Sequence, residues 1–78
     1  MITVTFYGLL RLDSGLRQVQ VEASDLRQLR QALLTTCPTL TKDRLRGCVM
    51  LVNGIPANKR TKLKDGDQVS LLSPVAGG

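Results

Sequence analysis

A change in the spacing of apolar residues near Ser24 constrains the fold of this chain more than any other feature. Before it, "MITVTFY" places Ile2, Val4 and Phe6 on one face and polar residues or tyrosine on the other, and "LRQVQVE" alternates again with one break. A period of two with many β-branched residues is typical of strands. The first 22 residues therefore predict two strands joined by a short loop, an opening hairpin.

From Ser24 onward the period becomes helical. Leucines follow at i, i+3 and i+7 from Leu26, which predicts a helix with one apolar face. Ser24 or Asp25 can cap its N-terminus. Pro38 disfavours helical backbone at the preceding residue, so the helix is predicted over residues 25–36.

The second half of the sequence returns to strands. Residues 39–47 are polar and basic and predict a connection with room for a short turn. "CVMLVNG" is a nearly continuous apolar run, which predicts a central strand covered on both faces. Its final Asn-Gly step predicts a tight turn, "IPAN" an edge strand, and "DG" at Asp65 another turn before a last strand over residues 68–72.

The predicted order is two strands, a helix and three strands. The helix must cover one face of a mixed sheet to bury its leucines. We therefore expect the α+β class and a β-grasp (ubiquitin-like) arrangement, with four to five strands and one main helix on one face. The predicted organisation is one domain over residues 1–72 and a flexible tail over residues 73–78.

The chain carries a net charge of +5, spread along the sequence with local groups over residues 42–46 and 59–64. Basic charge is compatible with nucleic acid, with an acidic protein partner, or with a solvated surface. Phe6 and Tyr7 are the only aromatic residues, so a base-stacking platform is poorly supplied. We expect docking or solvated charge here and no nucleic-acid site.

Several other functions are disfavoured by composition. Cys37 and Cys48 do not have the spacing of a metal or redox pair, and the chain has no histidine, so we expect buried structural thiols and no bound metal. No nucleophile–base constellation is evident, so we expect no enzyme activity from the chain alone. With no apolar run of membrane-spanning length and no signal-peptide pattern, we expect a cytoplasmic protein that has no membrane contact.

The sequence ends in "SPVAGG", and two final glycines cannot hold a fold together. Residues 73–78 span at most about 20 Å when extended. Without Cβ atoms, Gly77 and Gly78 can enter a channel too narrow for other residues. Once activated as an acyl-adenylate, the terminal carboxylate would accept a nucleophile such as sulfide or an amine. The chain lacks a GxxxxGK[ST] loop, so the ATP would be bound by a partner and no cofactor by this chain.

The segments "FYGLLR", "VNG" and "LKDGDQVSLLSPVAGG" resemble the MoaD/ThiS family of ubiquitin-like sulfur carriers, and most of all its molybdopterin synthase small-subunit branch. The resemblance implies that a ubiquitin-activating-type adenylyltransferase adenylates Gly78. A sulfur donor protein would then convert it to a thiocarboxylate. Finally, the large subunit of molybdopterin synthase would accept the tail and use its sulfur to convert precursor Z to molybdopterin.

Carried over by residue, the resemblance makes Gly78 the sulfur-carrying residue. The tail that precedes it consists of Pro74, Val75, Ala76 and Gly77. Partner-binding candidates are Phe6 and Arg11 from the opening segment, and Leu72. The strand parity that assigns Val69 and Leu71 to the core turns Leu72 away from the helix.

Two departures from the family and three alternatives accompany this interpretation. The net charge is unusual for the family, and Ser73 stands where many relatives carry a second proline, which predicts a looser tail. The same scaffold serves sulfur carriers of cysteine, thiamine or tRNA pathways, and ubiquitin-like modifiers joined to lysine. An unrelated β-grasp binding module is the third alternative, in which deletion of Gly77 and Gly78 would leave binding intact.

Overall fold

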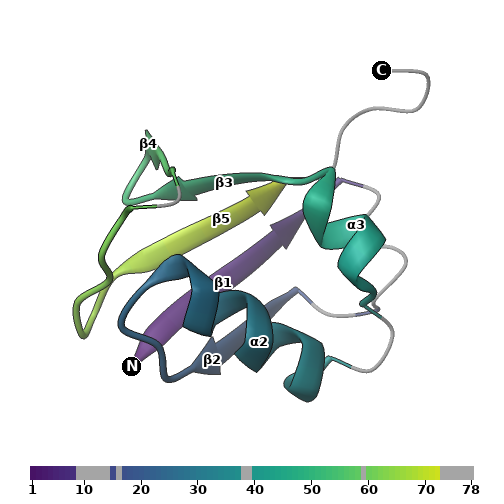
Figure 1. Cartoon of the computed structure of the whole chain (residues 1–78), viewed down its shortest axis with the longest axis horizontal. Coiled ribbons are helices and arrows are strands. Elements are labelled where there is room, and N and C mark those ends of the chain that lie inside the picture. Colours follow the sequence, from purple (N-terminus) through teal and green to yellow (C-terminus); the bar gives the residue numbers. More distant parts are fainter. Residues whose placement is uncertain (9–14, 16, 38–39, 59, 73–78) are drawn as a thin grey trace.

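A computed structural model describes residues 1–8, 15, 17–37, 40–58 and 60–72. Within these residues, five strands and two helices follow one another (Figure 1). Their bounds are β1 (Ile2–Tyr7), β2 (Gln18–Val21), α2 (Leu26–Thr36), α3 (Lys42–Arg46), β3 (Val49–Val52), β4 (Ile55–Pro56) and β5 (Gln68–Leu72). The predicted strands and main helix are confirmed, and α3 is an addition to them.

The strands form one mixed sheet in the order β2-β1-β5-β3-β4. β1 pairs with β2 in antiparallel fashion, which confirms the opening hairpin, and with β5 in parallel. β5 is antiparallel to β3, and β3 to the short edge strand β4. The last strand of the chain therefore lies in the middle of the sheet, with neighbours on both sides. This is the mixed sheet of a β-grasp protein, as predicted.

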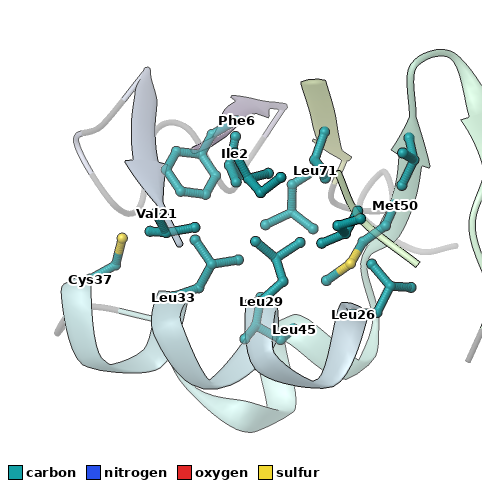
Figure 2. Packing of buried hydrophobic residues seen from close by; sticks show 14 of the residues in the cluster. Ile2, Phe6, Val21, Leu26, Leu29, Leu33, Cys37, Leu45, Met50 and Leu71 are labelled. Carbon is teal, nitrogen blue, oxygen red and sulfur yellow. The ribbon is translucent and has the colours of Figure 1, made fainter. Parts of the chain in front are cut away.

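The hydrophobic core fills the space between the sheet and the helical layer. Figure 2 shows leucines of α2 pointing toward side chains of the strands, with both helices on the same side of the sheet. Three of the four α2 leucines and most apolar residues of the inner sheet face are buried; the most deeply buried include Ile2, Val4, Phe6, Leu29, Leu33, Val69 and Leu71. The predicted leucine stripe of the helix is therefore its core-facing side.

Local hydrogen bonds explain where the helices begin. The Asp25 carboxylate accepts from the Gln28 backbone N–H at 2.8 Å, and the Gln28 side chain accepts from the Ser24 backbone N–H at 2.9 Å. Together these two hydrogen bonds cap the N-terminus of α2. At the start of α3, the Thr41 hydroxyl accepts from the Arg44 N–H at 3.2 Å, and Leu45 is buried beneath the short helix.

Two turns frame the start of β5. Asn53 has φ 51° and Gly54 has φ 83° between the paired residues Val52 and Ile55, as the Asn-Gly step predicts. Gly66 has φ 92° in the second turn. The Asp67 carboxylate joins the two turns, because it accepts from the Lys64 backbone N–H at 2.8 Å and from the Asn53 side-chain amide at 3.0 Å.

One expectation about the sheet is wrong. β3 was predicted to be covered on both faces, but both helices lie on the same face of the sheet, and β3 exposes alternate residues on the other. Val49 is 54% exposed and Leu51 is half-buried. The apolar run in β3 therefore combines a core-facing side with an apolar side that remains open.

The Asp67 network predicts a dependence of stability on pH. The hydrogen bond from the Lys64 N–H, and then that from the Asn53 amide, lower the pKa of Asp67. A carboxyl with a lowered folded-state pKa contributes stability at neutral pH that is lost as the pH falls from the ordinary carboxyl range through the lowered value. In Asp67→Asn, the amide places a donor against one of these donors.

We therefore expect Asp67→Asn to be less stable than the unmodified chain at pH 7 in urea unfolding. The difference should shrink as the pH falls below the ordinary carboxyl range and through the lowered pKa of Asp67, where the native carboxylate itself becomes protonated. Asp65→Asn, an exposed neighbour in the same turn, is a control for the change in net charge. A difference for Asp67→Asn that stays constant from pH 7 to pH 2 would contradict this role of the carboxylate.

Candidate functional site

The point from which the C-terminal segment departs is defined by the sheet. β5 ends at Leu72, which pairs with Tyr7 of β1 on one side and Val49 of β3 on the other. The tail candidates Pro74, Val75, Ala76, Gly77 and Gly78 lie outside the described residues. Their segment therefore starts from a strand that is held on both sides.

The residues that flank this point form an apolar row across the open face of the sheet. Register places Tyr7, Leu72 and Val49 side by side on the face opposite the helices. Tyr7 is 45% exposed, Val49 is 54% exposed, and Leu72 is half-buried between them. We call Tyr7, Leu72 and Val49 the apolar row; it confirms the predicted parity of Leu72, with Val69 and Leu71 in the core.

Away from the apolar row, the open face becomes polar over β1 and β2, whereas Leu51 and its exposed partner Pro56 keep it apolar over β3 and β4. The next row contains Thr5, Ser70 and Leu51, and the Gln18 side-chain amide donates to the Thr5 hydroxyl at 3.2 Å. Beyond it, Gln20 lies beside Thr3. The apolar row thus places three partly exposed apolar side chains side by side where β5 finishes, and such a surface marks an interaction site.

Two partner-binding candidates from the opening segment have different outcomes. The side chain of Phe6 is 1% exposed and lies in the core, so it cannot contact a partner, and this prediction is wrong for the structure. Arg11 lies outside the described residues. Tyr7 occupies the exposed position instead, and the alternation of "MITVTFY" already places it opposite Phe6.

The cysteines do not form a reactive site. Cys37 is buried, which confirms a structural thiol, and burial raises its pKa above the ordinary thiol value. Cys48 is half-buried, burial raises its pKa too, and its Sγ donates to the Arg44 carbonyl oxygen at 2.9 Å. A raised thiol pKa disfavours the nucleophilic thiolate at neutral pH.

Residues 1–8, 15, 17–37, 40–58 and 60–72 contain no group of three or more potential metal-ligating side chains. No helix within those residues is long and apolar enough to cross a membrane. The apolar row, at the point where β5 ends, offers an interaction surface on the sheet.

Known proteins resemble this chain in sequence and in fold. A model of the ThiS family matches residues 4–78. No curated protein matches the sequence. Among solved structures, a chain in the complex of subunits 1 and 2 of the molybdopterin-converting factor from Helicobacter pylori 26695 is 37% identical, with a TM-score of 0.72; the match covers 99% of this chain and 97% of that one.

Two further structures extend the range of the similarity. Urm1 from Trypanosoma brucei is 28% identical with a TM-score of 0.76, over 99% of this chain and 94% of that one. SAMP1 from Haloferax volcanii has a TM-score of 0.86 over 99% and 98% of the two chains, but at 23% identity it supports the shared fold alone.

Proposed function

We propose that this chain, which belongs to the ThiS family of ubiquitin-like sulfur carriers, is the sulfur-donating small subunit of a molybdopterin synthase-type complex. The observation that carries the proposal is the position of the apolar row. The C-terminal segment leaves β5 at Leu72, between Tyr7 and Val49, so a partner seated on these three residues lies where the tail begins.

The chemistry requires a C-terminal carboxylate at Gly78. An oxygen of this carboxylate attacks the α-phosphate of ATP on an adenylyltransferase of the ubiquitin-activating type, and pyrophosphate leaves. The terminal sulfur of a donor's persulfide then attacks the acyl carbon, and AMP leaves. A thiol then attacks the donor's sulfur in the resulting acyl disulfide and forms a disulfide with the donor. The cleavage leaves a thiocarboxylate on Gly78.

The sequence motifs of the chain indicate which steps belong to this chain and which to its partners. It carries no P-loop motif, so ATP belongs to the activating partner and this chain is not an enzyme by itself. Gly77 and Gly78 suit a narrow channel in the large subunit because they lack Cβ atoms. The cytoplasm is the proposed compartment, where such activating enzymes and free thiols would coexist.

The choice of pathway rests on sequence identity. At 37% over 99% of the chain, the molybdopterin-converting factor relative exceeds the other structures described above. CysO in its complex with BexX from Amycolatopsis orientalis is 22% identical and supports the fold alone. Cysteine, thiamine or tRNA thiolation and protein modification therefore remain the alternative functions, and the reconstitution below tests the cysteine pathway among them.

The apolar row gives a direct prediction about docking. Leu72→Ala removes apolar contact area from the centre of the proposed interface, where a truncated anchor typically costs about 1–2 kcal/mol or more of binding, which is about five- to thirtyfold or more in Kd. Leu72 is only half-buried in the isolated chain, so we expect about 1 kcal/mol or less of lost folding stability.

Calorimetric titration against the adenylyltransferase or large subunit, together with thermal unfolding, checks this prediction. Gln20→Ala, on the polar end of the same face, is the matched control and should bind normally. If Leu72→Ala binds both partners as the unmodified chain does, the apolar row is not the docking surface. A loss of stability as large as that of Leu71→Ala would instead assign Leu72 to the core.

The pathway is tested by reconstitution. The thiocarboxylated chain is incubated with precursor Z and the large molybdopterin synthase subunit from its own source, and molybdopterin formation is measured. A parallel reaction supplies a cysteine-forming synthase of the CysO-dependent kind. Molybdopterin in the first reaction alone supports the proposal, whereas sulfur transfer only in the second assigns the chain to cysteine synthesis.

A further inference from the structure

The net charge of the chain is concentrated in its helical layer. Residues 26–46, from the start of α2 to the end of α3, contain five cations and one carboxylate, a net charge of +4 against +5 for the whole chain. The cations are Arg27, Arg30, Lys42, Arg44 and Arg46. The sequence separates them into two segments, and the fold places both helices on the same side of the sheet (Figures 1 and 2).

A groove lies between the two helices on this basic layer. Its volume is about 250 Å³, and it is lined by Arg30, Gln31 and Leu34 of α2 and by Lys42, Leu45 and Arg46 of α3. The α2 leucines that face the sheet are not among them, and Arg30 and Gln31 are exposed. The groove therefore opens on the side of the molecule away from the apolar row.

The groove has an apolar floor and a cationic rim. Leu34 is half-buried and Leu45 is almost fully buried, and together they supply the floor. Arg30 and Lys42 are exposed and form no ion pair within the described part of the chain. Arg46 lies 3.8 Å from Asp43, but both side chains are at least 80% exposed, so the pair neutralises little of the rim.

We propose that this groove binds an acidic amphipathic segment of a protein partner, with carboxylates on the rim and an apolar side chain on the floor. Charge complementarity requires the carboxylates, since three cations surround the opening. The floor requires an apolar group, because two leucines form it. At about 250 Å³, the groove is below the ~300–1,000 Å³ of typical small-molecule sites and fits one or two side chains of a peptide.

A nucleic acid matches the groove less well. Its phosphates would satisfy the rim, but its backbone has no apolar group for the leucine floor. Binding of single strands generally depends on aromatic stacking, and no aromatic residue lines the groove. An acidic protein segment satisfies both parts of the site.

The inferred site is independent of the sulfur-carrier function. It uses neither the apolar row nor the C-terminal residues, so an acidic segment bound there leaves the open sheet face available to a second protein. The chain would thus hold two partners at once, on opposite faces. This inference stands or falls separately from the role of Gly78.

The test uses a fluorescein-labelled synthetic helix-forming peptide with glutamates on one face and leucines on the other, titrated with the full chain at low and physiological salt. A second peptide has serine at each leucine position, and a labelled single-stranded oligonucleotide is the nucleic-acid probe. We expect the leucine-containing peptide to bind at least tenfold more tightly than the serine peptide and the oligonucleotide, as measured by fluorescence anisotropy.

Charge reversal locates the site. Arg30→Glu with Lys42→Glu should weaken peptide binding at least tenfold. Arg60→Glu with Lys62→Glu changes net charge by the same amount on exposed residues outside the groove, and should weaken it by less than threefold. Both pairs should leave the melting temperature and thiolation of the chain nearly unchanged, because all four side chains are exposed.

Three results would overturn the proposal. Equal losses in the two charge-reversed chains would show that net charge alone attracts the peptide. Equal affinity for the leucine and serine peptides would remove the apolar floor from the site. Tighter binding of the oligonucleotide, lost on reversal of Arg30 and Lys42, would assign the groove to nucleic acid.

Discussion

Leu29→Ala should remove a large part of the folding stability of this domain. Leu29 is fully buried at the centre of α2, where it points into the core between helix and sheet (Figure 2). A buried Leu→Ala change typically costs about 2–5 kcal/mol, because contacts are lost and a cavity remains. Small domains have only about 5–15 kcal/mol in total, so the variant should approach the threshold of folding.

Urea unfolding followed by circular dichroism measures this loss. Gln31→Ala, two residues along the same helix and exposed, is the control and should change stability by less than about 0.5 kcal/mol. If Leu29→Ala unfolds at the same urea concentration as Gln31→Ala, α2 does not cover the sheet in the manner described. Partner binding by Leu29→Ala should fall in proportion to the folded fraction.

The sequence predicts well those elements in which apolar residues recur with one spacing over the whole length of the element. β1 alternates over six residues, and α2 combines a leucine stripe with a capping pair at Asp25 and Gln28. The Asn-Gly step forms the predicted turn because Asn53 and Gly54 both adopt positive φ. Local chemistry determines these features, and it is visible in the sequence.

The elements that cannot be predicted from the sequence depend on contacts between residues that are distant along the chain. α3 has only five residues, too few for a helical period, and it is recognisable only by its Thr41 cap and buried Leu45. In β3, an apolar residue on the open face has the same appearance in sequence as a residue beneath a second helix. The sequence therefore predicts that Val49 is covered, whereas in the structure it is an exposed member of the apolar row.

The candidate site could be predicted in part for the same reason. Strand parity identifies Leu72 as facing away from the core, but only the register shows that Tyr7 and Val49 flank it. The basic groove was missed because Arg30 and Lys42 belong to different elements that meet only in the folded chain.

The second large effect concerns the C-terminus. Adding one alanine after Gly78, or deleting Gly78, should abolish thiolation by the cognate adenylating enzyme. One residue moves the carboxylate by about 3.5 Å, whereas misplacement of reacting atoms by about 1 Å already reduces rates strongly. The last strand, β5, ends at Leu72, six residues before Gly78, so both variants should have the same melting temperature as the unmodified chain.

Matched controls separate position from composition. Ala76→Gly leaves the length unchanged and keeps Gly78 terminal, so it should be thiolated. The extended chain must be checked by mass for trimming before it is scored. Thiolation of the untrimmed extended chain at the normal rate would show that the reactive group is not the carboxylate of Gly78.

The central claim is tested most directly by the intact mass of this chain after incubation with its adenylating enzyme, ATP, a persulfide donor and a thiol that cleaves the acyl disulfide, and of the same chain purified from its own host. We predict a gain of about 16 Da, the replacement of one carboxylate oxygen by sulfur, located by fragmentation at Gly78 and absent without ATP. An unchanged mass in both preparations, or a gain located at Cys37 or Cys48, would contradict the assignment of Gly78 as the sulfur-carrying residue.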